Sequence, residues 1–273
     1  MELKTNLKIS SLLKTAIDAS IEAGKAILEV YENTDFQVHE KGDKSPLTAA
    51  DLNSNKVINE YLVPTQIPII SEENKQLDFE VRKQWETCWM VDPLDGTKEF
   101  IKRNGEFTVN IALIHDGAPV LGVIYVPVTR ELYFAEIKDQ KAFKLVLNEN
   151  HELPDTPLTA SNQIHPGSES QSKIRIVGSR SHMNSDTEHF ISNIKEQYEE
   201  VEIVSKGSSL KFCLVAEGKA DIYPRFAPTM EWDTAAGHAI CKAVGLQVIS
   251  NDTNEELPYN KENLLNSHFL IRN

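Results

Sequence analysis

The segment Trp89-Met90-Val91-Asp92-Pro93-Leu94-Asp95-Gly96-Thr97 joins an apolar stretch to a turn that carries two aspartates. Residues 87–91 have the composition of a strand, which the first aspartate ends. Within the turn, proline fixes one φ and glycine tolerates unusual dihedral angles. A rigid turn of this kind can aim Asp92, Asp95 and the Leu94 carbonyl at one point, and Mg²⁺ prefers such hard oxygen ligands. An ordinary capped turn is the alternative, because Asp-Pro and Asp-Gly are frequent in turns.

Acidic residues recur at the ends of other predicted elements. Glu72 and Glu73 follow a short apolar strand at 67–70, where adjacent carboxylates repel each other unless a cation or a donor offsets the repulsion. Asp51 lies in the first turn of one predicted helix, and Asp233 opens another. A solvated loop, a favourable helix dipole and N-capping are the ordinary explanations. Taken together with the turn at 92–95, these sites indicate a composite metal site at one edge of the sheets.

Thr97 begins a predicted short helix that runs to about Arg103. Backbone N–H groups at a helix N-terminus bind phosphate oxygens readily, although a plain helix cap is the alternative for this threonine. Lys98, Lys102 and Arg103 are candidates for a basic rim that steers an anion past a negative surface.

The composition restricts the class of protein. The 273 residues carry a formal net charge of −13, which disfavours binding to long nucleic acids because those affinities depend on clustered Lys and Arg. An acidic protein that binds an anionic substrate needs local positive charge, which Mg²⁺ would supply. No apolar run approaches the roughly 20 residues of a transmembrane segment. The chain has three cysteines, far apart and without a CxxC pair, which favours a reducing cytoplasm over a disulfide framework.

The periodicity predicts two lobes. The first, residues 1–147, combines two helices with an antiparallel sheet, and the second, residues 148–273, alternates strands and helices, giving an α+β / α/β architecture. The polar stretch 148–172 is the expected joint, and 39–46 reads as a mobile loop. We expect helices at 7–31, 48–62, 185–198, 209–217 and 233–244, and strands at 67–70, 87–91, 107–113, 120–126, 131–136, 141–147, 173–177, 201–204 and 220–223.

Other chemistries do not fit the sequence. Gly96 at the sixth position of an EF-hand loop would put Val91 and Pro93 at ligand positions, and no P-loop motif is present. The stretch 178–182 lacks the closing glycine of a nucleophile elbow. No HExxH spacing and no cysteine pair indicates a zinc site.

Four motifs in order resemble the inositol-monophosphatase-like metal-dependent phosphatases. They are Thr48-Ala49-Ala50-Asp51, Ser71-Glu72-Glu73, Asp92-Pro93-Leu94-Asp95-Gly96-Thr97 and Trp232-Asp233-Thr234-Ala235-Ala236-Gly237. Within that family, residues 91–114, 207–218 and 223–226 are most similar to the bacterial 3′(2′),5′-bisphosphate nucleotidases of sulfate assimilation. The resemblance covers nearly the whole chain and is looser at 148–172 and in the last twenty or so residues.

The resemblance implies a layered α/β/α/β/α sugar-phosphatase fold and two or more Mg²⁺ ions. One ion would be held by Glu72, Asp92 and the Leu94 carbonyl, and a second by Asp92, Asp95 and Asp233. The implied catalytic residues are Asp51, Thr97 and Glu72, of which Asp51 and Thr97 would orient and deprotonate the attacking water. The Lys41–Ser45 loop would close over the site. The implied substrate site comprises Glu72, Leu94, Asp95, Gly96, Thr97, Asp233, Ser208, Lys211 and Arg225.

The implied reaction is hydrolysis of 3′-phosphoadenosine 5′-phosphate to AMP and phosphate, with Lys211 and Arg225 as candidates for the second phosphate; a solvated basic residue is the alternative for each. A phosphatase for inositol monophosphate or fructose 1,6-bisphosphate on the same metal site is the nearest rival. A noncatalytic metal- or nucleotide-binding regulator is a rival of another class, but it would need neither Asp51 nor Thr97. The implied location is the cytoplasm or the cytoplasmic face of the bacterial inner membrane; the sequence leaves the oligomeric state open.

Overall fold

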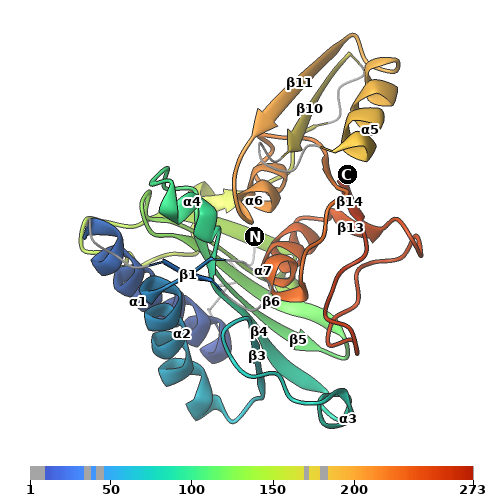
Figure 1. Cartoon of the computed structure of the whole chain (residues 1–273). Helices are drawn as coiled ribbons and strands as arrows, with labels where there is room; N and C mark the ends of the chain where they lie inside the picture. The colour runs from blue at the N-terminus through green and yellow to red at the C-terminus, as the bar shows by residue number, and fades with distance from the viewer. Residues whose placement is uncertain (1–9, 34–37, 41–45, 169–171, 179–183, 273) are drawn as a thin grey trace, which may run out of the picture.

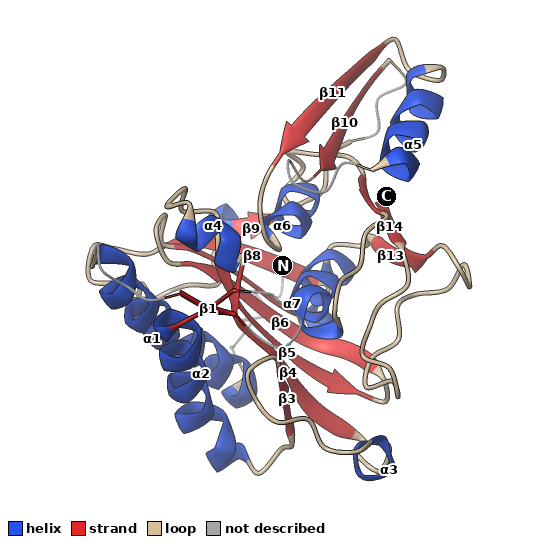
Figure 2. Ribbon diagram, in the orientation of Figure 1, coloured by secondary structure: helices blue, strands red, loops and turns tan. Residues whose placement is uncertain are grey.

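The chain folds into stacked layers of helices and sheets (Figure 1). The computed structural model describes residues 10–33, 38–40, 46–168, 172–178 and 184–272. The layers are, in order, helices α1 (Ser11–Glu32) and α2 (Ala49–Leu62), a seven-stranded sheet, helices α6 (Leu210–Ala216) and α7 (Glu231–Ala243), two small sheets, and helix α5 (Ser185–Lys195). Figure 2 shows the large sheet between the two groups of helices. The layered arrangement expected from the sequence is therefore confirmed.

The strands of the large sheet follow one another in chain order. They are β3 (Ile69–Ser71), β4 (Thr87–Asp95), β5 (Thr108–His115), β6 (Ala118–Val126), β7 (Glu131–Glu136), β8 (Lys141–Val146) and β9 (Gln163–Ile164). β3 and β4 are parallel and all the other neighbours are antiparallel. Because Ser71 pairs with Val91 in the parallel register, Glu72 and Asp92 come next on the two neighbouring chain segments and lie at the same end of the sheet.

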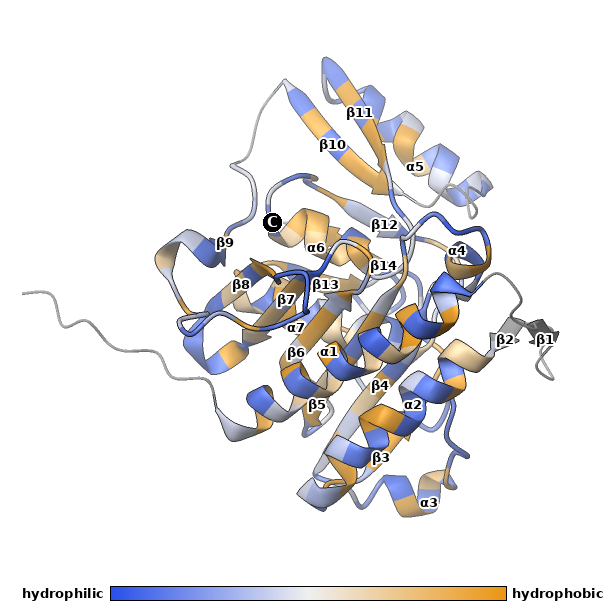
Figure 3. Ribbon diagram, turned by 90° about the vertical axis from the view of Figure 1, so that its left-hand side faces the viewer, coloured by the Kyte–Doolittle hydropathy of each residue, from blue (hydrophilic) through white to orange (hydrophobic). Residues whose placement is uncertain are grey.

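Alternating side chains of the sheet enter two separate cores. Phe107, Val109, Ile111 and Leu113 belong to the core under α1 and α2, as their period-two spacing predicts. Residues of the opposite face, such as Met90 and Ala112, pack with α6 and α7. Figure 3 shows the banded hydropathy of α1 and α2 that this one-sided burial requires.

The N-terminus of α2 is fixed as the sequence predicts. Thr48 is the N-cap, its hydroxyl accepts a hydrogen bond from the Ala50 N–H, and Asp51 completes a capping box. Before it, β1 (Val38–Glu40) pairs with β2 (Pro46–Thr48), so the prediction of a loop over 39–46 is wrong at its two ends. The Lys41–Ser45 loop lies outside the described residues.

Helix α7 lies unusually close to the large sheet because its inner face carries small residues. A Cβ placed on Gly122 of β6 would lie 2.4 Å from the Ala236 carbonyl oxygen. A Cβ on Gly237 would lie 2.3 Å from Cγ of Phe212 on α6. Real Cβ atoms do not approach other atoms this closely, so these glycines allow α7 to pack closely against β6 and α6.

The outer layer corrects two sequence predictions. β10 (Lys173–Gly178) and β11 (Glu200–Ser205) form a parallel pair, and β12 (Tyr223–Arg225), β14 (Phe269–Arg272) and β13 (Gln247–Ser250) form an antiparallel sheet. The strand predicted at 220–223 is therefore displaced toward Arg225, because its pairing partner, β14, comes from the end of the chain. β13 and β14 themselves were not predicted. The division at 147/148 stays a prediction. Within the described residues, no helix is long and apolar enough to cross a membrane.

Candidate active site

A cavity of about 350 Å³ opens where the end of β4, the loop before α6 and the start of α7 meet. Its walls combine carboxylates, hydroxyls and basic groups drawn from both halves of the chain. They are Glu72, Asp92, Leu94, Asp95, Gly96, Thr97, Lys98, Glu99, Gly207, Ser208, Ser209, Lys211, Phe212, Tyr223, Arg225, Pro228, Thr229, Asp233 and Thr234. The structure thus brings together all the sequence-predicted metal and substrate residues, and it places Asp51 directly behind Thr97.

A β-bulge brings both aspartates of the turn into this cavity. β4 does not stop at Asp92 as the sequence predicts, because Asp92 pairs with Asn110 and Asp95 pairs with Thr108. From Asp92 to Asp95, β4 thus advances by three residues alongside only two residues of β5, from Asn110 to Thr108. In a regular strand, residues three apart point to opposite faces, whereas one extra residue restores them to the same face. The bulge spans Pro93 and Leu94. Pro93 has no N–H to donate, and Ser54 Oγ donates to the Pro93 carbonyl at 2.6 Å.

The carboxylates of the cavity repel one another strongly. Burial and the nearby Glu72, Asp95 and Asp233 raise the pKa of Asp92 well above its ordinary value. Burial and Asp95 raise the pKa of Asp233 to about 8. Such a group of acids is stabilised by a cation bound among them. The donor set consists of carboxylate and carbonyl oxygens without a cysteine or histidine among the lining residues, so it fits Mg²⁺.

Asp95 is held by three donors from two other segments. Ser208 Oγ donates to Asp95 Oδ2 at 2.7 Å, the Ser209 N–H at 2.5 Å and Asn110 Nδ2 at 3.5 Å. Ser209 Oγ also donates to Asn110 Oδ1 at 2.7 Å, and Thr108 Oγ1 lies 2.7 Å from Ser208 Oγ. These contacts fix one oxygen of Asp95.

Sequence reasoning missed Ser209, Asn110 and Thr108. The available signal was the alternation in β5, where Thr108 and Asn110 are polar positions of an otherwise apolar face. Both side chains are fully buried. A buried polar side chain requires a partner, so polar residues in a buried strand indicate a network.

Thr97 and Asp51 form a hydrogen-bonded pair. Thr97 is the first residue of α4 (Thr97–Ile101), after Gly96 in the left-handed region at φ 96°, and Thr97 Oγ1 donates to Asp51 Oδ1 at 3.2 Å. The other oxygen of Asp51 accepts from the Thr48 N–H at 2.8 Å and from Thr48 Oγ1 at 2.6 Å. Thr97 is therefore not a plain cap, since the N-cap of α4 is Gly96.

Asp233 both caps a helix and lines the cavity. It is the third residue of α7, and its Oδ2 accepts a hydrogen bond from the Met230 N–H at 2.8 Å. The two interpretations that the sequence left open are thus compatible, because the capping contact uses one oxygen of the carboxylate.

The basic residues of the cavity differ in their surroundings. Lys211 is 5% exposed and its Nζ donates to the carbonyls of Lys206 and Ser208, while burial lowers its pKa to about 8. Arg225 donates from Nη2 to the Pro228 carbonyl at 3.1 Å, and its buried Nε has no protein partner. Of the predicted basic rim, only Lys98 lines the cavity. Arg103 instead packs on Tyr31, with its guanidinium 4.7 Å from the ring centroid.

A separate acidic group lies outside the cavity. Glu86, His115 and Asp116 are all exposed at the far end of β4 and β5. His115 Nε2 lies 3.8 Å from Glu86 and 3.7 Å from Asp116. Exposed groups of this kind are common as simple surface ion pairs.

The layered fold and the cavity lined by carboxylates and basic groups are those of a class of metal-dependent phosphate-ester hydrolases. Residues 8–270 match the model of the inositol monophosphatase family, and the chain belongs to that family. A 3′(2′),5′-bisphosphate nucleotidase CysQ of Shigella flexneri is 46% identical over 229 residues, 83% of this chain and 85% of that protein.

Solved structures agree with this assignment. The crystal structure of CysQ from Bacteroides thetaiotaomicron, a bacterial member of the inositol monophosphatase family, is similar with a TM-score of 0.86 and 49% identity over 98% of each chain. An inositol monophosphatase from Anabaena has a TM-score of 0.69 and 23% identity, covering 96% of this chain and 90% of that one. The second likeness shows the fold alone.

Proposed function

We propose that this chain is a Mg²⁺-dependent 3′(2′),5′-bisphosphate nucleotidase that hydrolyses 3′-phosphoadenosine 5′-phosphate to AMP and phosphate, as in sulfate assimilation. The observation that carries the proposal is the cavity in which Glu72, Asp92, Asp95 and Asp233 meet Thr97. Relatives named 3′(2′),5′-bisphosphate nucleotidase, 44–46% identical over most of the chain, support this substrate class. The buried, unpaired thiols of Cys88, Cys213 and Cys241 support a cytoplasmic location.

Two Mg²⁺ sites share Asp92 in this proposal. Glu72, Asp92 and the Leu94 carbonyl would hold one ion, and Asp92, Asp95 and Asp233 would hold the other. The carboxylates face one cavity, and their charges help to raise the pKa of Asp92 and of Asp233, which supports cation binding at this place. When bound, the ions supply positive charge for the developing negative charge and acidify the attacking water.

Thr97 and Asp51 receive the proton in the proposed reaction. The water oxygen forms a bond to phosphorus, the bond between phosphorus and the ester oxygen of the nucleotide breaks, and that ester oxygen takes a proton from a solvent water molecule to leave as the hydroxyl of AMP. The water proton passes to Thr97 Oγ1 as the Thr97 hydroxyl proton moves to Asp51 Oδ1 along the 3.2 Å contact. Thr48 donates two hydrogen bonds to the other oxygen of Asp51, which orients that carboxylate before the reaction.

The remaining groups of the cavity bind the substrate. The Gly96 and Thr97 amides at the start of α4 receive the transferred phosphate, and Glu72 and Ser208 lie beside it. Arg225 is the stronger candidate for the second phosphate, because its buried Nε has no protein partner whereas Lys211 already holds two carbonyls. Lys98 adds positive charge at the mouth of the cavity.

A substrate comparison tests the proposal. Phosphate release is measured from 3′-phosphoadenosine 5′-phosphate, inositol monophosphate and fructose 1,6-bisphosphate, each with Mg²⁺, with EDTA and with added Li⁺. We expect the nucleotide to be hydrolysed fastest, EDTA to abolish release, and Li⁺ to inhibit it. Equal or faster turnover of inositol phosphate would make the substrate assignment wrong. Nucleotide binding without any turnover would instead support a noncatalytic regulator.

A further inference from the structure

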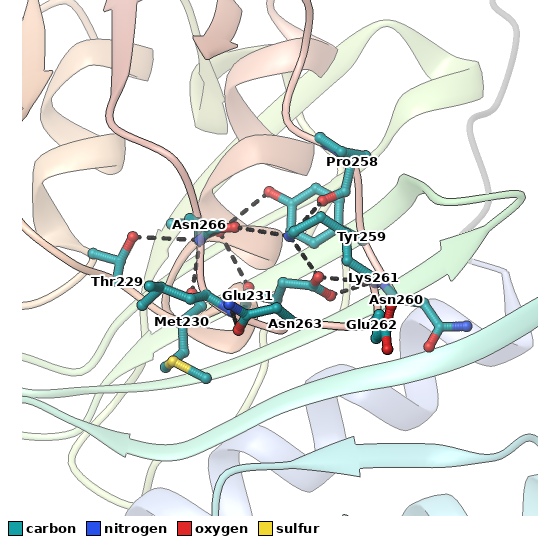
Figure 4. Close-up of polar contacts among 12 residues, drawn as sticks. Thr229, Met230, Glu231, Pro258, Tyr259, Asn260, Lys261, Glu262, Asn263 and Asn266 are labelled. Atoms are coloured by element: carbon teal, nitrogen blue, oxygen red, sulfur yellow. Dashed lines mark hydrogen bonds and ion pairs between the residues drawn. The ribbon is translucent and has the colours of Figure 1, made fainter. Parts of the chain in front are cut away.

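A buried carboxylate stands two residues before Asp233 and takes no part in the cavity. Glu231 is the first residue of α7, and its side chain is fully buried. It accepts hydrogen bonds from the Asn260 N–H at 2.6 Å, from the Lys261 N–H at 3.1 Å and from Lys261 Nζ at 2.6 Å (Figure 4). All three donors come from one irregular segment, residues 258–266, hereafter the 258–266 segment.

The same segment holds the residues on both sides of Asp233. Asn266 Nδ2 donates to the Met230 carbonyl at 2.9 Å and to Thr234 Oγ1 at 3.0 Å. The Glu231 N–H donates to the Leu264 carbonyl at 2.9 Å. Met230 in turn donates its N–H to the carboxylate of Asp233. The position of the Asp233 side chain therefore depends on where the 258–266 segment holds the first turn of α7.

The other side of the segment is fastened to the connection that follows Glu72. Arg82, at the end of α3 (Phe79–Arg82), is 3% exposed. Its Nη1 donates to Asn260 Oδ1 at 2.8 Å and to the Lys261 carbonyl at 3.0 Å, and Asn260 Nδ2 donates back to the Arg82 carbonyl at 2.8 Å. The segment thus links the chain that carries Glu72 to the helix that carries Asp233.

Burying a charged pair is costly, and an apolar contact would join two elements as firmly. The fixed geometry of a carboxylate with three donors does what an apolar contact cannot, since it defines one position of the helix start. On the basis of the proposed function, we propose that Glu231, Lys261 and Arg82 are positioning residues. They hold Asp233 at the distance from Asp92 and Asp95 at which the second divalent cation binds.

Metal affinity tests this role without relying on turnover. Mn²⁺ binding to the full-length, metal-free chain is measured by calorimetry for wild type, Glu231→Gln, Lys261→Met and Lys261→Arg. We expect Glu231→Gln and Lys261→Met to weaken one of the two sites about tenfold or more, as the loss of groups that orient metal ligands does. Lys261→Arg should restore most of the affinity because it keeps the charge. In the phosphatase assay, the Mg²⁺ concentration for half-maximal activity should rise by the same factor.

Two matched variants separate positioning from a general loss of stability. Ile240→Val shortens a fully buried side chain on the same helix, and Lys242→Met removes the ion pair with Glu256 near the other end of α7. Both should lower Tm without changing Mn²⁺ affinity. If Glu231→Gln and Lys261→Met lower Tm as much as these two controls but bind Mn²⁺ like wild type, the positioning role is wrong and the proposed function stands. If wild type itself binds no Mn²⁺, both are wrong.

Discussion

Ser208 donates its hydroxyl to Asp95 across 113 residues of sequence, at 2.7 Å. Ser208 has a left-handed backbone, with φ 54°. Lys211 Nζ donates to the Ser208 carbonyl, and Glu106 Oε2 accepts the Gly207 N–H at 2.9 Å, so both side chains hold this loop. A loop of the second half of the chain therefore orients a carboxylate of the first half. The cavity works as one unit only when both halves are in place.

Removing this hydroxyl should weaken metal binding. A hydrogen bond to a charged group contributes about 1.5–3 kcal/mol, so Ser208→Ala should raise the Mg²⁺ requirement about tenfold or more. The Ser209 N–H still holds Asp95, which limits the effect. Phosphate release as a function of Mg²⁺ concentration measures it. Ser205→Ala, at an exposed position of β11, is the control and should leave the curve unchanged.

Loss of the Thr97 hydroxyl should slow the chemical step. General acid–base groups typically contribute about 10²–10⁴-fold, so Thr97→Ala should lower kcat at least about a hundredfold while KM changes little. Thr97→Ser keeps the hydroxyl that donates to Asp51 and should retain most of the activity. Steady-state kinetics of the two variants provide the comparison, and near-normal kcat in Thr97→Ala would contradict the assigned proton path.

Metal removal should expose the repulsion among the carboxylates. Mg²⁺ at about a hundredfold above its Kd adds about 2.7 kcal/mol to the stability of the folded chain. Because the pKa of Asp233 is raised to about 8 in the folded chain, this carboxyl must take up a proton on folding at pH 7 or stay charged among the other acids. Asp233→Asn removes that cost, so it should raise Tm in EDTA and reduce the Mg²⁺-induced rise. Thermal unfolding with and without Mg²⁺ measures both effects. A variant that is less stable than wild type in EDTA would show that the carboxylates do not repel as described.

His238 should make the fold sensitive to acid. Burial lowers its pKa below the ordinary value of 6.5, and its Nδ1 lies 3.0 Å from the Tyr259 hydroxyl. A group whose pKa falls on folding contributes stability that is present above its unfolded pKa and lost as the pH decreases below it. Between pH 7 and pH 5, Tm should therefore fall more for wild type than for His238→Gln. His189→Gln, at an exposed position of α5, should follow wild type.

Gly237 should resist substitution because α6 lies against it. Its added Cβ would meet the buried ring of Phe212 at 2.3 Å, so Gly237→Ala should cost about 1–3 kcal/mol despite the better helix propensity of alanine. Thermal unfolding should show a Tm lower by several degrees. At Gly178 an added Cβ meets nothing within 4 Å, and Gly178→Ala should leave Tm nearly unchanged. Equal effects at the two positions would contradict the packing argument.

Several parts of the molecule follow from the sequence alone. The period of the apolar residues determines α1, α2 and the strands β3 to β8 of the large sheet, because each buries one face. β9 was not predicted, since it lies in the polar stretch 148–172 that was expected to be a joint. The four acidic motifs identify the candidate metal ligands because, taken together, they place carboxylates at the ends of several elements. Thr48 marks the start of α2 because two side chains accept from backbone N–H groups within one turn. The Thr48 hydroxyl accepts from the Ala50 N–H, and the Asp51 carboxylate accepts from the Thr48 N–H.

Only the tertiary structure decided how these pieces meet. The bulge that turns Asp92 and Asp95 to one side depends on pairing with β5. The donors to Asp95 and the contacts of Glu231 come from segments that are distant in sequence. The course of β12 depends on β14, at the end of the chain. Local patterns indicate which face of an element is buried, whereas the partner of a buried polar group depends on how distant elements pack. The motif at 92–97 can therefore be recognised in the sequence, but the groups that orient its side chains cannot.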